Sequence, residues 1–136
     1  MHLKTLSSAL CLTLASLWFG PTHANEQPQY SKQYEDCMEA VDLGAMKNSQ
    51  WMACAEQELK RVDADLNANY KKLQQALNTE QREALKKAQR AWLQYRKERC
   101  DFEYVAPTAP GGEANRSFCL LEMTAQKSQY LRQMHN

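Results

Sequence analysis

Residues 88–100 read AQRAWLQYRKERC, and this stretch decides how the chain folds. Trp92 and Tyr95 lie three residues apart, a spacing that returns to one side of an α-helix. Gln89 and Arg96 lie seven residues apart, so this polar pair also shares one side. The stretch therefore predicts an amphipathic helix that ends close to Cys100.

Helix-breaking residues are absent for a long distance on both sides of this stretch. Neither glycine nor proline occurs in residues 45–106, and the strand-like alternation of apolar and polar residues is missing. We therefore expect an all-α protein. Three helices are expected at about residues 31–43, 48–77 and 79–103, and Gly44 follows the first of them. After a loop at residues 107–112, a last helix begins at Asn115 or Ser117.

The two central helices carry matching apolar stripes. Both stripes repeat at nearly seven-residue spacing, so the two helices should pack as a long antiparallel hairpin. Asn78 lies between them and can cap the free amides of the second helix. A short N-terminal helix and a C-terminal helix complete a small bundle. The stripes are Trp51, Ala55, Leu59, Val62, Leu66, Tyr70, Leu73 and Leu77, then Leu85, Ala88, Trp92, Tyr95 and Phe102.

Residues 1–24 have the features of a signal peptide. Lys4 precedes an apolar run, residues 6–19, which is shorter than the roughly 20 residues of a membrane span. A Gly-Pro pair and small residues follow the run, as signal peptidase requires. We expect cleavage after residue 24, which leaves residues 25–136 as a single domain.

This domain has no excess of either charge. The whole chain has 17 basic and 16 acidic residues, and cleavage removes one of the basic residues, Lys4. Nucleic-acid-binding proteins usually show a marked basic excess, and anionic lipid attracts polybasic segments. We therefore expect neither a nucleic-acid partner nor stable membrane anchoring after cleavage.

The cysteines of residues 25–136 indicate a disulfide-stapled bundle. An even number of cysteines in a small exported chain is typical of disulfide bonds in an oxidising compartment. Four thiolates could instead bind zinc, but zinc sites usually contain close pairs such as C-x-x-C, and none occurs here. The hairpin should bring all four to one end of the bundle. They are Cys37, Cys54, Cys100 and Cys119.

Four cysteines can pair in three ways. Cys54 with Cys100 is sterically conceivable, because the hairpin places both at nearly the same height. We choose Cys37 with Cys54 and Cys100 with Cys119, since each of these bonds closes the connection between consecutive helices.

The chain offers few side chains for catalysis. His135 is the only histidine in residues 25–136, so a Ser-His-Asp triad and a multi-histidine metal centre are excluded. Carboxylates such as Glu56, Asp63 and Asp65 could in principle act as glycosidase acids, but acidic residues this frequent on helices usually form a solvated face. We expect no enzymatic activity, no metal and no cofactor.

Polar residues of the two central helices form a candidate structural network. Counted from the turn, Asn67 and Gln89 lie at the same height, so their amides could meet. Asp63 lies near Trp92 and Arg96 and could accept a hydrogen bond from either one. The alternative is that these residues line a binding groove. The set is Asp63, Asn67, Tyr70, Gln89, Trp92 and Arg96.

Several of these residues also form a pattern that extends from about Cys37 to Leu131. Its members are Cys54, Asp63, Leu66, Asn67, Tyr70, residues 88–92, Tyr95, Arg96, Cys100, Gly111, Gly112, Cys119 and Thr124. The pattern resembles that of exported proteins grouped with the lysozyme inhibitor LprI by their N-terminal domain. Two positions depart from it: Glu113 stands where serine is common, and Lys127 stands where arginine is common.

The resemblance implies an exported helical protein, periplasmic or secreted, whose partner is a protein such as a lysozyme. An inhibitor of a lysozyme must cover a sugar-binding cleft that contains catalytic carboxylates. Residues 104–116 would be held rigid beside the second disulfide bond. Arg116 would act as a carboxylate partner and Tyr104 as an amphipathic anchor, with Glu113 in the same segment. The alternative is an ordinary connection between helices.

A different class of function is a periplasmic chaperone or envelope-stress interaction protein without inhibitory activity. Residues 77–81 are similar to the L-T-x-x-Q signature of helical periplasmic chaperones, although Asn78 stands in place of the threonine. An exposed, concave apolar surface would favour this function. A closed bundle with one projecting loop would favour inhibition.

Overall fold

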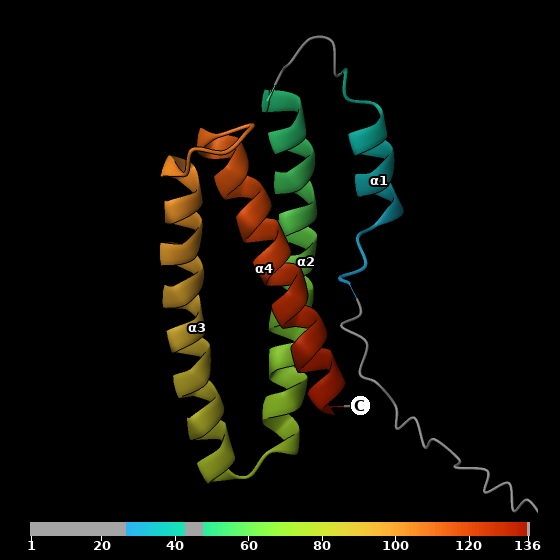
Figure 1. The fold of residues 1–136 in the computed structure, drawn as a ribbon. Helices are drawn as coiled ribbons and strands as arrows, with labels where there is room; N and C mark the ends of the chain where they lie inside the picture. Colours follow the sequence, from blue (N-terminus) through green and yellow to red (C-terminus); the bar gives the residue numbers. More distant parts are fainter. Residues whose placement is uncertain (1–26, 43–47, 136) are drawn as a thin grey trace, which may run out of the picture.

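The computed structural model describes residues 27–42 and 48–135, so the expected signal peptide and Gly44 lie outside the described residues. Within these ranges the chain forms four helices and no strand, which confirms the all-α prediction (Figure 1). No helix of the described part is long and apolar enough to cross a membrane. The helices are α1 (Lys32–Glu39), α2 (Asn48–Ala76), α3 (Thr79–Val105) and α4 (Gly112–His135).

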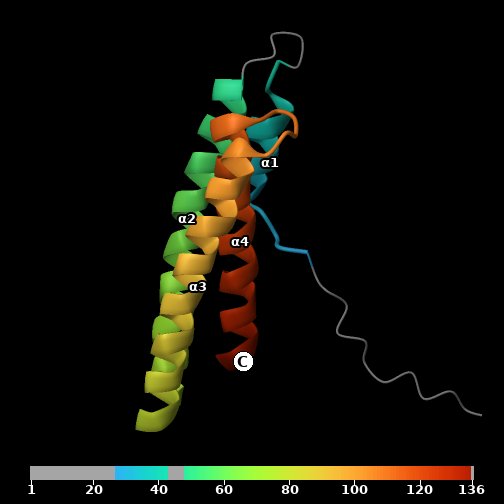
Figure 2. The same ribbon diagram turned by 60° about the vertical axis from the view of Figure 1, so that its left-hand side comes forward.

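The three long helices form the body of the molecule. α2 and α3 are antiparallel and joined by a tight turn, as predicted, but the expected packing of these two helices along their length is not seen (Figure 1). α4 runs antiparallel to α3 and parallel to α2, and it packs against both (Figures 1 and 2). It contacts each of them more extensively than they contact each other. The short α1 packs against α2.

The core lies mainly between α2 and α4. Small polar residues on α4, Ser117, Thr124 and Ser128, are buried as well, and the Ser128 hydroxyl accepts a hydrogen bond from Asn69 Nδ2 of α2 at 3.1 Å. Burying a leucine side chain contributes roughly 1.5–3 kcal/mol, so the leucines of the two helices dominate this interface. The buried apolar residues are Ala55, Val62, Leu66 and Leu73 of α2 with Leu121, Ala125 and Leu131 of α4.

Only part of the apolar stripe predicted for α3 reaches this core. Leu85 and Trp92 pack against it, as expected. Tyr95 and Phe102 do not, because each is 59% exposed, and Ala88 is exposed as well. The prediction was wrong for these three residues because it packed α3 along α2, whereas α3 packs mainly against α4 and Cys100 is the only residue of α3 that is fully buried.

Side chains fix the starts of two helices. Ser31 caps α1 by accepting a hydrogen bond at 3.2 Å from the amide of Tyr34, and α1 ends at Glu39, earlier than predicted. At the start of α3, Asn78 Oδ1 accepts from the Gln81 amide at 2.9 Å, and Gln81 Oε1 accepts from the Asn78 amide at 3.0 Å. This reciprocal capping box confirms Asn78 as the cap.

The start of α4 differs from the prediction. The helix begins at Gly112 rather than at Asn115 or Ser117. Asn115 holds the preceding loop instead, because its Oδ1 accepts from the Gly111 amide at 3.0 Å and its Nδ2 donates to Thr108 Oγ1 at 2.8 Å. Asn115 is of a residue type that often caps helices, but here its side chain stabilises the loop that precedes the helix.

Both predicted disulfide bonds are present. Cys37 and Cys54 have Cα atoms 5.8 Å apart, and Cys100 and Cys119 have Cα atoms 5.4 Å apart, both within the usual range. The first bond ties α1 to α2, and the second ties α3 to α4. As predicted, the cysteines lie away from the α2–α3 turn: Cys54 is near the start of α2, Cys100 near the end of α3 and Cys119 near the start of α4.

A buried carboxylate fastens the segment before α1 to α2. Glu58 is 4% exposed and accepts hydrogen bonds from the Ser31 amide at 2.8 Å, the Ser31 hydroxyl at 2.7 Å and Arg61 Nη2 at 2.5 Å. Burial alone would raise the pKa of Glu58, but the bonds from Arg61 and Ser31 outweigh burial and lower it. Sequence reasoning missed Glu58, although its spacing from Cys54 and Val62 places it on the buried stripe.

Candidate functional site

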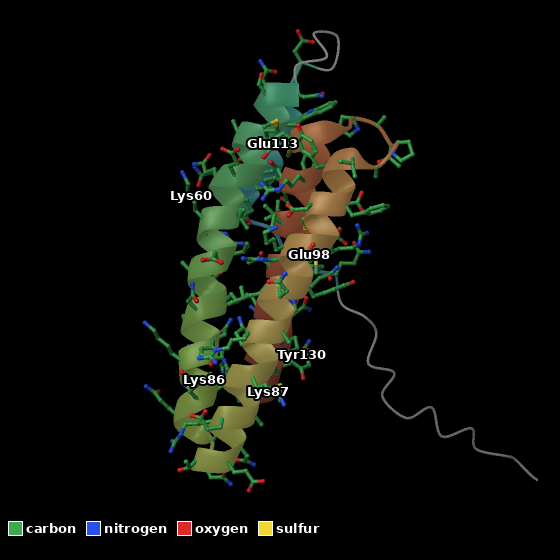
Figure 3. The ribbon with its side chains drawn as sticks, turned by 90° about the vertical axis from the view of Figure 1, so that its left-hand side faces the viewer. Lys60, Lys86, Lys87, Glu98, Glu113 and Tyr130 are labelled. Carbon is green, nitrogen blue, oxygen red and sulfur yellow. A yellow bond between two sulfur atoms is a disulfide. The ribbon has the colours of Figure 1, made fainter. Side chains whose placement is uncertain are left out.

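The residues predicted to contact a partner lie where α3 ends and α4 begins. Tyr104 is half exposed near the end of α3, and Glu113 and Arg116 are in the first turns of α4. Arg116 Nε donates to Asp101 Oδ1 at 3.0 Å, and Arg116 Nη1 donates to Glu113 Oε1 at 3.3 Å. We call Asp101, Tyr104, Glu113 and Arg116 the loop flank. Figure 3 shows Glu113 at this end of the molecule, far from Lys86 and Lys87.

The charged groups of the loop flank already neutralise one another. Lys97 Nζ lies 2.5 Å from Asp101 Oδ2, so Asp101 is shared between two cations. The hydrogen bonds from Lys97 and Arg116 lower the pKa of Asp101, and the bond to Asp101 raises the pKa of Arg116. Arg116 was predicted to reach a carboxylate of a partner, and two carboxylates of its own chain hold it. A partner would have to share this guanidinium with them.

The loop at residues 106–111 has a fixed backbone shape. Gly111 and Gly112 adopt φ angles of 85° and 56°, which residues with a side chain rarely adopt. The contacts of Asn115 close the loop from inside, and the nearby Cys100–Cys119 bond joins the two helices that it connects. Such a loop loses little conformational freedom when a partner binds.

A groove of about 470 Å³ lies between α3, α4 and this loop. We call it the α3–α4 groove. None of Tyr104, Glu113 and Arg116 is among the residues that line it, so it is a second surface at the same end of the molecule. The lining residues are Tyr95, Arg99 and Glu103 of α3, Thr108 and Ala109 of the loop, and Asn115, Phe118, Cys119, Glu122, Met123 and Gln126 of α4.

The walls of the α3–α4 groove carry unequal charge. Arg99 and Glu103 form an ion pair along α3, and Glu122 on α4 accepts a hydrogen bond from Gln126 Nε2 at 3.0 Å. The bond to Glu103 raises the pKa of Arg99, and the negative charge of Glu122 raises it further. The lining thus holds two carboxylates against one guanidinium.

A disulfide bond forms part of the groove floor. Cys119 and Met123 both line the groove, and the Met123 sulfur lies 3.8 Å from Cys100 Sγ and 3.9 Å from Cys119 Sγ. Cys100 is fully buried. The covalent link between α3 and α4 therefore fixes the distance between the two walls.

The predicted polar network is present in part. Asp63 Oδ1 lies 3.7 Å from Arg96 Nη1, which is one of the two partners expected for this carboxylate. Asn67 Nδ2 donates to Asp63 on its own helix at 3.1 Å, and the Tyr70 hydroxyl also bonds within α2. Gln89 Oε1 is buried with no hydrogen-bond partner in the described residues. The expected pairing of the Asn67 and Gln89 amides is therefore not seen.

Two residues of α4 complete this network, and sequence reasoning missed both. Arg96 Nη1 donates to the hydroxyl of the buried Thr124 at 2.8 Å. Arg96 and Lys127 lie 4.9 Å and 5.8 Å from the centroid of the Trp92 ring, and burial lowers the pKa of Lys127. Thr124 and Lys127 are three residues apart, so their spacing alone could have placed both on the side of α4 that faces α3.

The carboxylates considered for glycosidase chemistry have other surroundings. Asp65 accepts a hydrogen bond from Arg61 at 2.7 Å, Asp63 faces Arg96, and Glu56 is exposed. Among the described residues, no group of three or more His, Cys, Asp or Glu side chains is placed to hold a metal ion.

Comparison with known proteins gives two matches. The family model described as "Lysozyme inhibitor LprI" matches residues 37–131. A protein of Rhizobium meliloti (strain 1021), named "Uncharacterized protein R02472", is 31% identical over 145 residues, which cover 95% of this chain and 91% of the relative. No solved structure gives a significant match.

Proposed function

Because this chain belongs to the lysozyme inhibitor LprI family, we propose that it is an exported protein that binds a lysozyme and blocks cleavage of cell-wall glycan. Family membership over residues 37–131 is the observation that carries this proposal. The two disulfide bonds support a periplasmic or secreted location, since such bonds persist in oxidising compartments. The partner is then a protein, and the chain acts by contact with it rather than by catalysis.

The end of the molecule that carries the loop suits this task. A lysozyme cleft contains two carboxylates and accepts sugar rings, so an inhibitor needs a firm projection with polar and aromatic groups. The loop of residues 106–111 is held by Asn115 and lies next to a disulfide bond. Tyr104, Glu113 and Arg116 beside it are the proposed contact residues, with Tyr104 as the aromatic anchor.

A periplasmic chaperone or envelope-stress protein without inhibitory activity is the second candidate. The segment similar to the chaperone signature, residues 77–81, serves here as the capping box of α3. The groove has charged side chains on both walls, Arg99, Glu103 and Glu122, whereas a chaperone surface for unfolded chains is expected to be concave and apolar. These features favour inhibition over the chaperone function.

The proposal is tested by inhibition of cell-wall lysis. The exported, oxidised protein is titrated into lysozymes of the c, g and i types while the turbidity of a cell-wall suspension is followed. We expect at least one type to be inhibited at one-to-one stoichiometry. Inhibition of none of the three would show that the proposed function is wrong.

The same assay tests the contact residues. Tyr104→Ala and Arg116→Ala should each raise the inhibition constant about tenfold, the effect of losing a moderate binding hot spot. Tyr130→Ala is a matched control, because Tyr130 is 51% exposed and Tyr104 is 50% exposed, and Tyr130 lies toward the opposite end of α4 (Figure 3). Full inhibition by both loop-flank variants would remove this site assignment and leave the function standing.

A further inference from the structure

Two aromatic side chains lie exposed on α3 near the α3–α4 groove. Tyr95 lines the groove, and Phe102 lies seven residues further along the same side of the helix. Both are 59% exposed, although their spacing with Trp92 is that of a core stripe. Neither α2 nor α4 covers them. Large apolar groups left open beside a groove are typical of a surface that a partner covers.

The charge of the groove indicates which chemistry such a partner has. Glu103 is partly buried and forms an ion pair with Arg99. Glu122 on the opposite wall is exposed, and among the described residues it accepts a hydrogen bond from Gln126 and forms no ion pair. The Arg99 guanidinium already lies near both carboxylates, which shows that the lining can hold a cation. With two carboxylates and one guanidinium, the lining still has a net negative charge. A second cation that enters from solvent would find an unneutralised carboxylate and the face of an exposed tyrosine.

The groove is also preorganised. The Cys100–Cys119 bond sets the spacing of its walls, Met123 fills the space beneath, and Asn115 fixes the loop at its end. A partner therefore meets a surface that needs little rearrangement, so most of the contact energy is available for binding.

We propose that the α3–α4 groove receives a basic side chain, Arg or Lys, from the surface of the bound lysozyme, beside Glu122 and against Tyr95. This inference rests on the proposed function and adds a docking surface to the loop flank. Tyr95 of the groove and Tyr104 of the loop flank are nine residues, or about two and a half helical turns, apart, so the two surfaces face different sides of α3. A partner that covers this end of the molecule would contact both. The groove lining has one carboxylate more than its cations, whereas Lys97 balances the second carboxylate of the loop flank.

The test measures the dissociation constant for the lysozyme that the protein inhibits, by isothermal titration calorimetry at low and at moderate salt. Glu122→Gln removes the free carboxylate and keeps the length of the side chain. Its matched control is Glu98→Gln on the same helix as Tyr95 (Figure 3). Glu98 is also exposed, also accepts a hydrogen bond from a glutamine four residues away, Gln94 at 2.7 Å, and does not line the groove.

We expect Glu122→Gln to weaken binding about tenfold and to make binding less dependent on salt, because one charge pair is lost. Glu98→Gln should change the dissociation constant less than twofold. Tyr95→Ala should weaken binding about tenfold, with Tyr130→Ala as its control. All four side chains are exposed, so their thermal unfolding should match that of the unmodified protein, and this is checked by circular dichroism.

Other results would separate the two proposals. If the unmodified protein binds no lysozyme, the proposed function and this inference fall together. If it binds and Glu122→Gln and Tyr95→Ala bind equally well, only the groove assignment is overturned. If sedimentation shows a dimer that Glu122→Gln dissociates, the groove is occupied by a second copy of the chain, and the inference is likewise wrong.

Discussion

A single buried carboxylate, Glu58, fastens the start of α1 to α2, in addition to the Cys37–Cys54 disulfide bond. Its hydrogen bonds, two from Ser31 and three from the Arg61 guanidinium, compensate for the loss of water around a charge that is 4% exposed. The bonds stabilise the ionised form more than burial opposes it, so the pKa of Glu58 is lowered on folding. Glu58 therefore links the stability of the protein to pH.

The direction of this link follows from the lowered pKa of Glu58. Above its ordinary pKa of 4.5, Glu58 is ionised in both states and its bonds contribute fully to stability. As the pH falls below 4.5, the unfolded chain takes up the proton first, and the contribution is lost as the pH passes the lower pKa of the folded state.

We predict that Glu58→Gln lowers the free energy of unfolding at pH 7 by about 2 kcal/mol, because charged hydrogen bonds are lost. The variant should also lose less stability than the unmodified protein between pH 5 and about pH 3, a range that brackets the ordinary carboxylate pKa. Urea unfolding at several pH values measures both effects. Equal acid sensitivity of the two proteins would show that Glu58 is not the linked group.

Individual residues differ in how well the sequence alone could place them. Cys37 and Cys54 could be paired because the chain between them is short and each lies on its own helix, so few geometries allow a bond. Tyr95 and Glu58 could not be placed by residue type. An aromatic residue was assigned to the core and an acidic one would be assigned to solvent, and the structure has the reverse. The position of Tyr95 depends on which helix lies opposite α3, and the sequence of α3 alone does not reveal that. The spacing of Glu58 from Cys54 and Val62, in contrast, does place it on the buried side of α2.

At the scale of helices, α3 shows which features depend on neighbouring residues in the sequence and which depend on the whole bundle. The start of α3 was predictable because the capping box needs only four consecutive residues, 78–81. The side of α3 that faces inward was not, because α4 lies against α3 and its place depends on the whole bundle. For the same reason the predicted pairing of Asn67 with Gln89 is absent, and Arg96 donates a hydrogen bond to Thr124 of α4.

We predict that Asn78→Ala lowers the free energy of unfolding by about 1 kcal/mol, the usual cost of losing an N-cap. Asn78 is exposed, so no packing is lost with it. Asn78→Ser retains an oxygen that can cap the helix and should cost much less. Urea unfolding of the two variants gives the comparison. An equal loss in both would mean that the amide of Asn78 has a role other than capping.

At the scale of the whole molecule, two disulfide bonds share the task of holding four helices. They close loops of similar length, with sequence separations of 17 and 19 residues. In the chain-entropy account each bond stabilises the fold by about 3 kcal/mol. Their positions differ, because only the Cys100–Cys119 bond joins the walls of the α3–α4 groove.

We predict that replacing either pair by serines lowers the free energy of unfolding by about 3 kcal/mol. The effects on binding should differ. Loss of Cys100–Cys119 should weaken lysozyme binding at a temperature where both variants are folded, and loss of Cys37–Cys54 should leave binding nearly unchanged. Calorimetric titration of both variants, checked by circular dichroism, measures this. Equal weakening by both would show that the bonds act only through overall stability.

The place of α4 determines when an exported chain can take its shape. α4 packs against both of the earlier long helices, and its residues follow theirs in the chain. Until this segment has crossed the membrane, the apolar sides of α2 and α3 stay open to water and to any carrier or protease nearby. The polypeptide should therefore remain protease-sensitive through most of its translocation and become resistant in one late step.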